Sequence, residues 1–225
     1  MKYKNVVAGI FRARPNRFIA MVDIDGKREV CHVKNTGRCR ELLIEGCTVY
    51  LEKADNLSRK TAYDLIAVQK GSRLINMDAQ APNHVFAEWA AENFCSGIQL
   101  IKPEFVYGDS RLDFCLETNR GRHLVEVKGV TLEADGFVYF PDAPTERGVR
   151  HIRELQRAVR EGLDATLVFV IQMEGVRGLS PNDATHPEFG AALREAAAEG
   201  VQVAAWDCAV TPDTLEIRHR VPVVL

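Results

Sequence analysis

The sequence predicts an α/β protein with two domains, an N-terminal β-barrel and a C-terminal α/β domain with a mixed central sheet. Three observations support this prediction. The first eighty residues consist of short apolar runs separated by turn residues, the later residues alternate helical and strand patterns, and the two regions differ in charge. A length of 225 residues suits one large domain or two modest ones. We place the domains at residues 1–81 and 82–225.

The composition is that of an ordinary globular protein, with 46% hydrophobic and 27% charged residues. No apolar run approaches the roughly 20 residues that span a bilayer, and the N-terminal residues lack a signal-peptide pattern. We therefore expect a cytoplasmic protein with no membrane partner. The six cysteines include no pair two or three residues apart, which argues against a zinc site.

The net charge of −2 hides an asymmetry between the two regions. Residues 1–80 contain 15 Lys and Arg against 9 Asp and Glu, a balance of +6, whereas residues 81–225 contain 14 against 22, a balance of −8. A basic region can attract a polyanion, and an acidic region can hold a cation. Charge alone would also fit two solvated surfaces without such roles.

The N-terminal strands are predicted from apolar or alternating runs bounded by turns. Asp25-Gly26 is a two-residue hairpin signal, Asn35-Thr36-Gly37-Arg38 has turn chemistry, and residues 39–43 suit one helical turn. The predicted strands cover residues 5–11, 18–24, 27–34, 46–53 and 61–69. Five short strands with a small helical insert suit a closed barrel of the OB type, which commonly binds oligonucleotides.

The C-terminal region changes to an alternation of helices and strands. Asn83 is predicted to cap a helix over residues 84–94, and Thr145 a helix over 145–161, because both are good N-cap residues. A third helix is expected over 188–199. The predicted strands cover residues 104–107, 111–118, 123–130, 137–140, 166–172 and 201–206. A recognition helix near the C-terminus is excluded because residues 201–206 alternate like a strand.

Charged residues on two neighbouring strands form the chemical signal. Alternation places Asp113 on one face of its strand, and Glu126 and Lys128 on one face of the next. A turn near residues 119–121 makes these strands neighbours, so the three side chains can converge. Glu126-Val127-Lys128 alone is a weak signal, since opposite charges are common on solvated strands. The matching Asp113 makes the signal stronger.

Two adjacent carboxylates repel unless a cation lies between them, and hard oxygen ligands suit Mg²⁺ or Mn²⁺. Such a metal can bind a phosphate oxygen and lower the pKa of bound water. Lys128 beside it can orient the water and offset phosphate charge. Glu88 on the preceding helix is a less certain third carboxylate.

Two runs of residues carry a resemblance to a known family. Glu126-Val127-Lys128-Gly129-Val130-Thr131-Leu132 and Phe140-Pro141-Asp142-Ala143-Pro144-Thr145 resemble the sugar fermentation stimulation protein A (SfsA) family, and the resemblance covers essentially the whole chain. It implies an OB-like N-terminal domain and a C-terminal PD-(D/E)xK nuclease-like domain. It also implies DNA binding without sequence preference and a regulatory role in maltose metabolism.

The nuclease pattern implied by the resemblance assigns Asp113 and Glu126 as metal ligands and Lys128 as the catalytic lysine. Leu112 stands where the motif has proline, a position that varies among such folds. The resemblance also implies that Arg147 and His151, on the helix after Thr145, contact substrate phosphates.

The basic N-terminal region supplies further candidates for nucleic-acid binding. Arginines give affinity without base identity, because phosphates carry no sequence information. Phe11 and Phe18 could stack on bases if exposed, although aromatics in a small barrel are more often in the core. The candidate phosphate contacts are Arg12, Arg14, Arg17, Arg38 and Arg40.

Two functions therefore remain open. The first is a Mg²⁺- or Mn²⁺-dependent deoxyribonuclease acting without sequence preference, with single-stranded or structured DNA among its candidate substrates. The second is a non-enzymatic DNA-binding protein that regulates sugar metabolism. A small-molecule enzyme has less support, because no Gly-rich phosphate loop is present. Monomer and dimer are both open.

Overall fold

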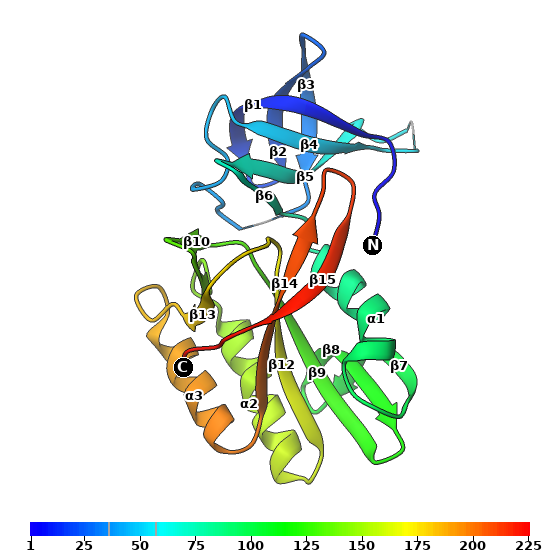
Figure 1. The fold of residues 1–225 in the computed structure, drawn as a ribbon, viewed down its shortest axis with the longest axis vertical. Helices are drawn as coiled ribbons and strands as arrows, with labels where there is room; N and C mark the ends of the chain where they lie inside the picture. The colour runs from blue at the N-terminus through cyan, green and yellow to red at the C-terminus, as the bar shows by residue number, and fades with distance from the viewer. Residues whose placement is uncertain (36, 57) are drawn as a thin grey trace.

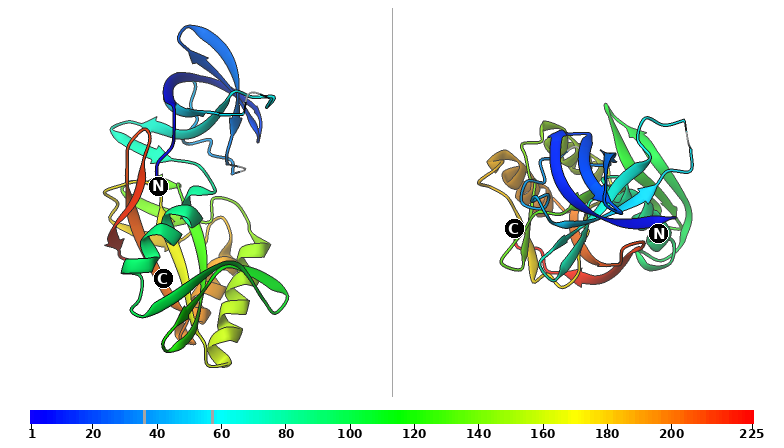
Figure 2. Two further views of the ribbon diagram at one scale, coloured as in Figure 1. Left: turned by 90° about the vertical axis from the view of Figure 1, so that its right-hand side faces the viewer. Right: turned by 90° about the horizontal axis from the view of Figure 1, so that it is seen from above.

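The computed structural model describes every residue except Thr36 and Leu57, and it shows two domains stacked end to end (Figure 1). A β-barrel, coloured blue to cyan, lies at one end, and an α/β domain, green to red, lies at the other. Figure 2 shows the same arrangement from two further directions. The predicted fold class is confirmed. Of the predicted turn at residues 35–38, Thr36 lies outside the described residues.

The barrel is one sheet with strand order β3-β2-β1-β4-β5-β6, and parallel pairing of β3 with β5 closes it. Gly9 lets β1 bend across β2, since a Cβ at this position would lie 2.5 Å from Cγ1 of Val22. The five predicted strands are present, and β6 is an additional one. Their bounds are β1 (Val6–Asn16), β2 (Ile19–Ile24), β3 (Lys27–Val33), β4 (Thr48–Lys53), β5 (Tyr63–Lys70) and β6 (Arg73–Asn76).

The α/β domain contains a mixed six-stranded sheet with order β15-β14-β12-β9-β8-β7. Strands β9, β12 and β14 run parallel, and the outer strands pair antiparallel. Its strands are β7 (Ile98–Tyr107), β8 (Ser110–Thr118), β9 (Gly121–Val130), β12 (Asp164–Ile171), β14 (Gln202–Val210) and β15 (Leu215–Val221). A small second sheet consists of β10 (Glu133–Ala134), β11 (Phe137–Phe140) and β13 (Gly178–Pro181).

Three helices cover the large sheet: α1 (Ala81–Asn93) on one face, and α2 (Glu146–Arg160) and α3 (Pro187–Ala198) on the other (Figure 1). Phe86 of α1 packs on Phe114 of β8, with ring centroids 5.3 Å apart. Ile152 and Leu155 of α2 join the core on the opposite face with Leu124 of β9. No helix in the described part of the chain is long and apolar enough to cross a bilayer.

Two local predictions in this domain were wrong. Asn83 does not cap α1, because Gln80 is the N-cap residue and Pro82 occupies the first turn, where its missing N–H costs no hydrogen bond. Strand β7 begins at Ile98 instead of residue 104 and runs through Pro103. A proline is tolerated there because β7 is an edge strand that pairs only with β8.

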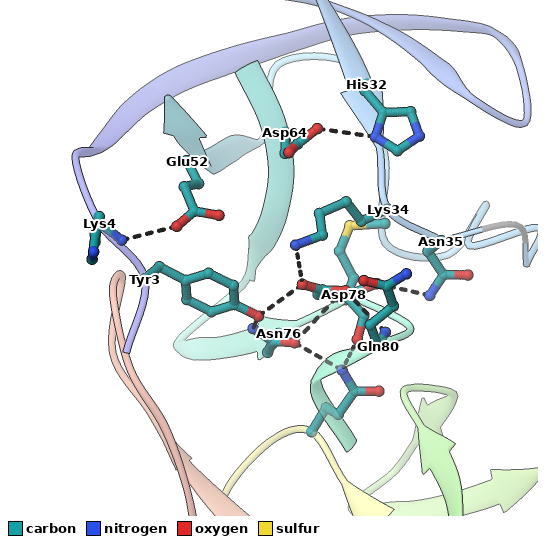
Figure 3. A network of polar contacts seen from close by, with 12 residues as sticks. Tyr3, Lys4, His32, Lys34, Asn35, Glu52, Asp64, Asn76, Asp78 and Gln80 are labelled. Carbon is teal, nitrogen blue, oxygen red and sulfur yellow. Dashed lines mark hydrogen bonds and ion pairs between the residues drawn. The ribbon is translucent and has the colours of Figure 1, made fainter. Parts of the chain in front are cut away.

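A buried polar network joins the two domains near the end of β12 (Figure 3). Gln172 Nε2 donates to Oδ1 of Asn76 at 2.8 Å and to the carbonyl of Asp78 at 2.9 Å. Asp78 also accepts from the hydroxyl of Tyr3 at 3.2 Å and pairs with Lys34 at 2.7 Å. Gln172, Asn76 and Asp78 are at most 2% exposed. Buried polar groups with complete partners fix one geometry, so this network holds the barrel in a defined position.

An ion-pair cluster forms a second junction between the domains. Glu133 of β10 accepts from Lys70 Nζ at 2.9 Å and pairs with Arg73 at 2.9 Å, both from the barrel. Partial burial raises the pKa of Glu133, but the hydrogen bonds from Lys70 and the Gly136 amide, with the nearby cations, outweigh it and lower the pKa to about 2. The ionised form is therefore strongly favoured in the folded chain.

We expect Glu133→Gln to lower the free energy of unfolding by about 2 kcal/mol at pH 7, the linkage value for this pKa shift reduced for partial exposure. The depressed pKa stabilises the fold above the unfolded value near 4.5, and this contribution is lost as the pH falls toward 2. Urea unfolding at pH 7 and pH 4 checks this. Glu92→Gln, an exposed position on α1, is the control; an equal loss there would contradict the assignment.

Candidate metal and phosphate site

The candidate metal site lies where β8 and β9 separate. The pairing of these strands ends with Phe114 opposite Val125. Beyond it, the amide of Asp113 donates to Oε2 of Glu126 at 3.3 Å, and the amide of Val127 donates to Oδ2 of Asp113 at 2.8 Å. Here the two backbone amides donate to carboxylate oxygens, where a continued β-ladder would offer them backbone carbonyls of the neighbouring strand. Each carboxylate is fixed by an amide of the opposite strand.

Lys128 lies on the same face of β9 as Glu126, as alternation predicts. Its Nζ donates to Oε1 of Glu126 at 2.5 Å, and its side chain is half-buried. The structure therefore brings Asp113, Glu126 and Lys128 together, in the arrangement expected from the two strands. An ammonium has three protons, so two remain for other acceptors.

The two carboxylates have different proton affinities. Burial raises the pKa of Asp113, and the negative charge of Glu126 raises it further. Burial also acts to raise the pKa of Glu126, but the His151 hydrogen bond and the Lys128 charge outweigh it, so this pKa is lowered. Lys128 and His151 thus both donate to Glu126, whereas Asp113 has no ion pair among the described residues. A cation beside Asp113 would relieve this imbalance.

His151 is buried, with 3% of its surface exposed, and both ring nitrogens have partners. Its Nδ1 lies 2.5 Å from Oε1 of Glu126, and its Nε2 accepts from Nε of Arg147 at 3.3 Å. Since Nε2 accepts, the proton lies on Nδ1 and is donated to Glu126. This position does not fit the predicted phosphate contact, because a buried ring cannot reach substrate. Arg147 is exposed and remains a candidate contact.

Under the nuclease hypothesis from the sequence, we expect His151→Leu to reduce turnover by about 10- to 100-fold, the usual effect of losing an outer hydrogen bond to a ligand, and to leave nucleic-acid affinity unchanged. His151→Asn, which keeps a donor, should recover part of the loss. Steady-state cleavage and fluorescence anisotropy measure the two properties. Weaker binding with a shallower salt dependence would instead support a phosphate contact.

Helix α1 contributes a different residue from the one predicted. Glu88 is 61% exposed at its side chain and pairs with the amino group of Met1 at 2.8 Å, so the structure does not place it in the cluster. Asn83 is the helix residue that reaches the site, where its Nδ2 donates to Oδ1 of Asp113 at 2.8 Å. Pro82 was the available signal, since it marks the first turn of the helix and places Asn83 inside it.

The predicted barrel arginines fall into two groups. Arg12 pairs with Asp23 at 2.6 Å. Arg14 donates to four backbone carbonyls at 2.6–2.9 Å, and thereby holds the turn after β1 against the segment after β3. Three others are exposed and have no side-chain partner among the residues that the structure describes: Arg17, Arg38 and Arg40.

The two barrel phenylalanines also differ. Phe11 is in the core, whereas Phe18 is 53% exposed beside Arg17. Exposure leaves only Phe18 able to stack on a base.

Two adjoining hollows lie between the barrel and the α/β domain. The first has a volume of about 540 Å³, and Arg17, Arg38 and Arg40 line it. The second, of about 350 Å³, is lined by Gly129, directly after Lys128, and by Tyr139. Gly37, Ala143 and Pro144 line both hollows, so the hollows adjoin.

The donor set fits a hard divalent cation. Asp113 and Glu126 supply carboxylate oxygens, which suit Mg²⁺ and Mn²⁺ better than soft metals. Within the residues that the structure describes, no three His, Cys, Asp or Glu side chains are grouped to hold a metal. A cation here would need water, backbone or phosphate oxygens as further ligands, which is how Mg²⁺ is commonly bound.

Proteins of one family match this chain over its full length. The family model described as the sugar fermentation stimulation protein RE domain matches residues 80–214, and that of the SfsA N-terminal OB domain matches residues 13–77. A sugar fermentation stimulation protein homolog of Desulfitobacterium hafniense (strain Y51) is 56% identical over 225 residues, covering 100% of this chain and 99% of the relative. One from Clostridium beijerinckii is 54% identical over 226 residues, covering 100% of both.

A solved structure shows the same architecture. The structure of Pyrococcus furiosus SfsA in complex with Ca²⁺ superposes with a TM-score of 0.90 at 28% identity, and the match covers 100% of this chain and 98% of that one.

Proposed function

The chain belongs to the sugar fermentation stimulation protein family, and from that premise we propose that it is a divalent-metal-dependent nuclease that binds DNA without sequence preference. The observation that carries the proposal is the meeting of Asp113, Glu126 and Lys128 where β8 and β9 separate. Its C-terminal domain is of the RE, or restriction-endonuclease-like, type. The structure of the Pyrococcus furiosus relative in complex with Ca²⁺ supports the binding of a divalent cation by this chain.

The chain's own residues would divide the work of phosphodiester hydrolysis. Asp113 and Glu126 would hold the metal, which when bound supplies charge stabilisation and a more acidic water. Lys128 has two protons beyond its bond to Glu126, enough to contact a phosphate oxygen and to orient water. His151 fixes the Glu126 carboxylate, and Asn83 fixes that of Asp113. Carboxylates that are already oriented before substrate binds need not reorganise in the transition state, which lowers the barrier.

The test is a cleavage assay on labelled single-stranded and duplex DNA with Mg²⁺, Mn²⁺, Ca²⁺ or EDTA. We expect cleavage with Mg²⁺ or Mn²⁺, none with EDTA, and loss of cleavage in Lys128→Met with DNA binding retained. A crystal soaked in Mn²⁺ should give anomalous signal between Asp113 and Glu126. Absence of cleavage on all substrates with both metals would refute the nuclease proposal.

A non-enzymatic DNA-binding protein with a regulatory role is the second candidate, and one observation favours it. Lys128 already pairs with Glu126 and His151 donates to it, and the described residues include no group of three metal-binding side chains. This candidate predicts DNA affinity that falls steeply with salt, without cleavage. The same assay separates the two, because only the nuclease needs Lys128.

A further inference from the structure

We propose that the two adjoining hollows form a groove for one strand of a polynucleotide, with Arg17, Arg38 and Arg40 contacting its phosphates and Tyr139 contacting a base. The inference rests on the proposed function, because it names the substrate that the same site would receive. Single-stranded DNA and RNA share this chemistry.

The groove ends next to the site without including its side chains. The arginine end lies on the barrel, beside the turn after β1, and the other end reaches Gly129 on β9. Gly129 follows Lys128 along the strand, so the two residues face opposite sides of the sheet, and none of Asp113, Glu126 and Lys128 is among the residues that line the hollows. A strand bound along the groove would therefore lie one residue along β9 from Lys128.

The arginine end is prepared to bind anions. Both terminal amino groups of Arg14 donate to backbone carbonyls, those of Arg17 and Arg38 among them, so Arg14 fixes the backbone that carries two of the exposed guanidinium groups. Among the described residues, no carboxylate lines this hollow. Asp142 is the one acidic residue of the described lining of the other, and its Oδ2 lies beside Gly37, which lines both. Guanidinium groups on a fixed backbone lose little freedom when they bind phosphate.

The other end offers an aromatic ring. Tyr139 of β11 is half-buried at the wall of the second hollow, and its hydroxyl has no hydrogen-bond partner among the residues that the structure describes. Pro144 adds a second apolar surface. Stacking on an aromatic ring is tolerant of base identity, which agrees with binding that has no sequence preference.

The size and walls of the groove favour one strand over two. Hollows of about 540 and 350 Å³ have room for a few nucleotides of one strand. The buried network of Gln172, Asn76 and Asp78 fixes the barrel against the α/β domain, so the groove does not simply widen. A ring can also stack only on a base that has left the duplex.

The test measures binding in EDTA, so that cleavage plays no part. Fluorescence anisotropy would compare labelled oligonucleotides of about 12 residues, within the usual range for an OB domain: single-stranded DNA, RNA of the same sequence and the DNA duplex. We expect the chain to bind single strands at least tenfold more tightly than duplex. The DNA and RNA arms identify which strand it prefers.

Four variants locate the groove. The double variant R38A/R40A should weaken single-strand binding at least tenfold and reduce the slope of log affinity against log salt by about 1.4, for two phosphate contacts. Tyr139→Leu should weaken it at least fivefold, while Tyr139→Phe, which keeps the ring, should not. Arg120→Ala removes an equally exposed arginine from the β8–β9 turn, outside both hollows, and should change nothing.

Equal or tighter binding of duplex would overturn the inference, as would an equal effect of Arg120→Ala and the R38A/R40A double variant. The surface arginine variants decide the matter even if Tyr139→Leu does not fold. Failure of the nuclease proposal alone would give a different pair of results. The preference for single strands would persist in EDTA, and adding metal would cause no cleavage. Cleavage without strand preference would overturn only the groove.

Discussion

Replacing Asp113 with asparagine should reduce metal-dependent cleavage by about a thousandfold or more, and leave the fold intact. The carboxylate would hold the cation, whose stabilisation of transition-state charge is worth several kcal/mol, and each 1.36 kcal/mol is a factor of ten in rate. Stability should change by only about 1 kcal/mol. Burial and the Glu126 charge raise the pKa of Asp113, so the folded chain disfavours its ionised form, and a neutral amide removes that cost.

Cleavage rates at saturating Mn²⁺ and urea unfolding of the same preparations check both parts of this expectation. Glu88→Gln is the matched control, because it neutralises a carboxylate of α1 that contacts the Met1 amino group instead of the site. It should retain full activity. Loss of activity in Glu88→Gln alone would show that helix α1 supplies a ligand and that Asp113 does not.

Replacing Gln172 with leucine should lower the free energy of unfolding by about 1–3 kcal/mol, a large effect for one residue that is outside the site. Leucine removes the donor for Oδ1 of Asn76 and for the carbonyl of Asp78, both buried. Each acceptor keeps one backbone donor, the Asp78 amide at 3.1 Å for Oδ1 of Asn76 and the Ala81 amide at 3.2 Å for the carbonyl of Asp78. The loss is therefore that of two hydrogen bonds, at about 0.5–1.5 kcal/mol each. The barrel would lose its fixed contact with β12.

Urea unfolding measures this loss. Gln69→Leu is the same chemical change at an exposed turn, where the amide donates only to the Gly71 carbonyl at 2.9 Å, and it should alter stability by less than about 0.5 kcal/mol. A loss in Gln172→Leu no larger than that in Gln69→Leu would mean that the junction network contributes little to stability.

The central cluster could be predicted from the sequence because it depends on simple periodicities. Alternation along two strands and one short turn are enough to place Asp113 near Glu126 and Lys128. The same reasoning could not find the environment of Glu126. His151 faces it from a helix 25 positions away, and helical spacing shows only which residues share a face, not what that face contacts.

The arginines show a second limit of the sequence. Composition identifies a basic N-terminal region, but it cannot separate Arg14, which binds backbone carbonyls inside the chain, from Arg38, which is exposed. That difference depends on the path of loops around each side chain. Short strands such as β6 and β13 were missed for a related reason, since four residues give too little periodicity to distinguish a strand from a loop.

Gln172 limits how freely the two domains could be exchanged between members of the family. Its amide reaches across from one half of the chain to acceptors belonging to the other, so neither half presents a self-sufficient surface at that point. A chimera that joined this barrel to the α/β domain of a distant relative would need to carry a matching amide at the same place. Recombination of the two domains during evolution would therefore be constrained by a few polar atoms at the domain interface.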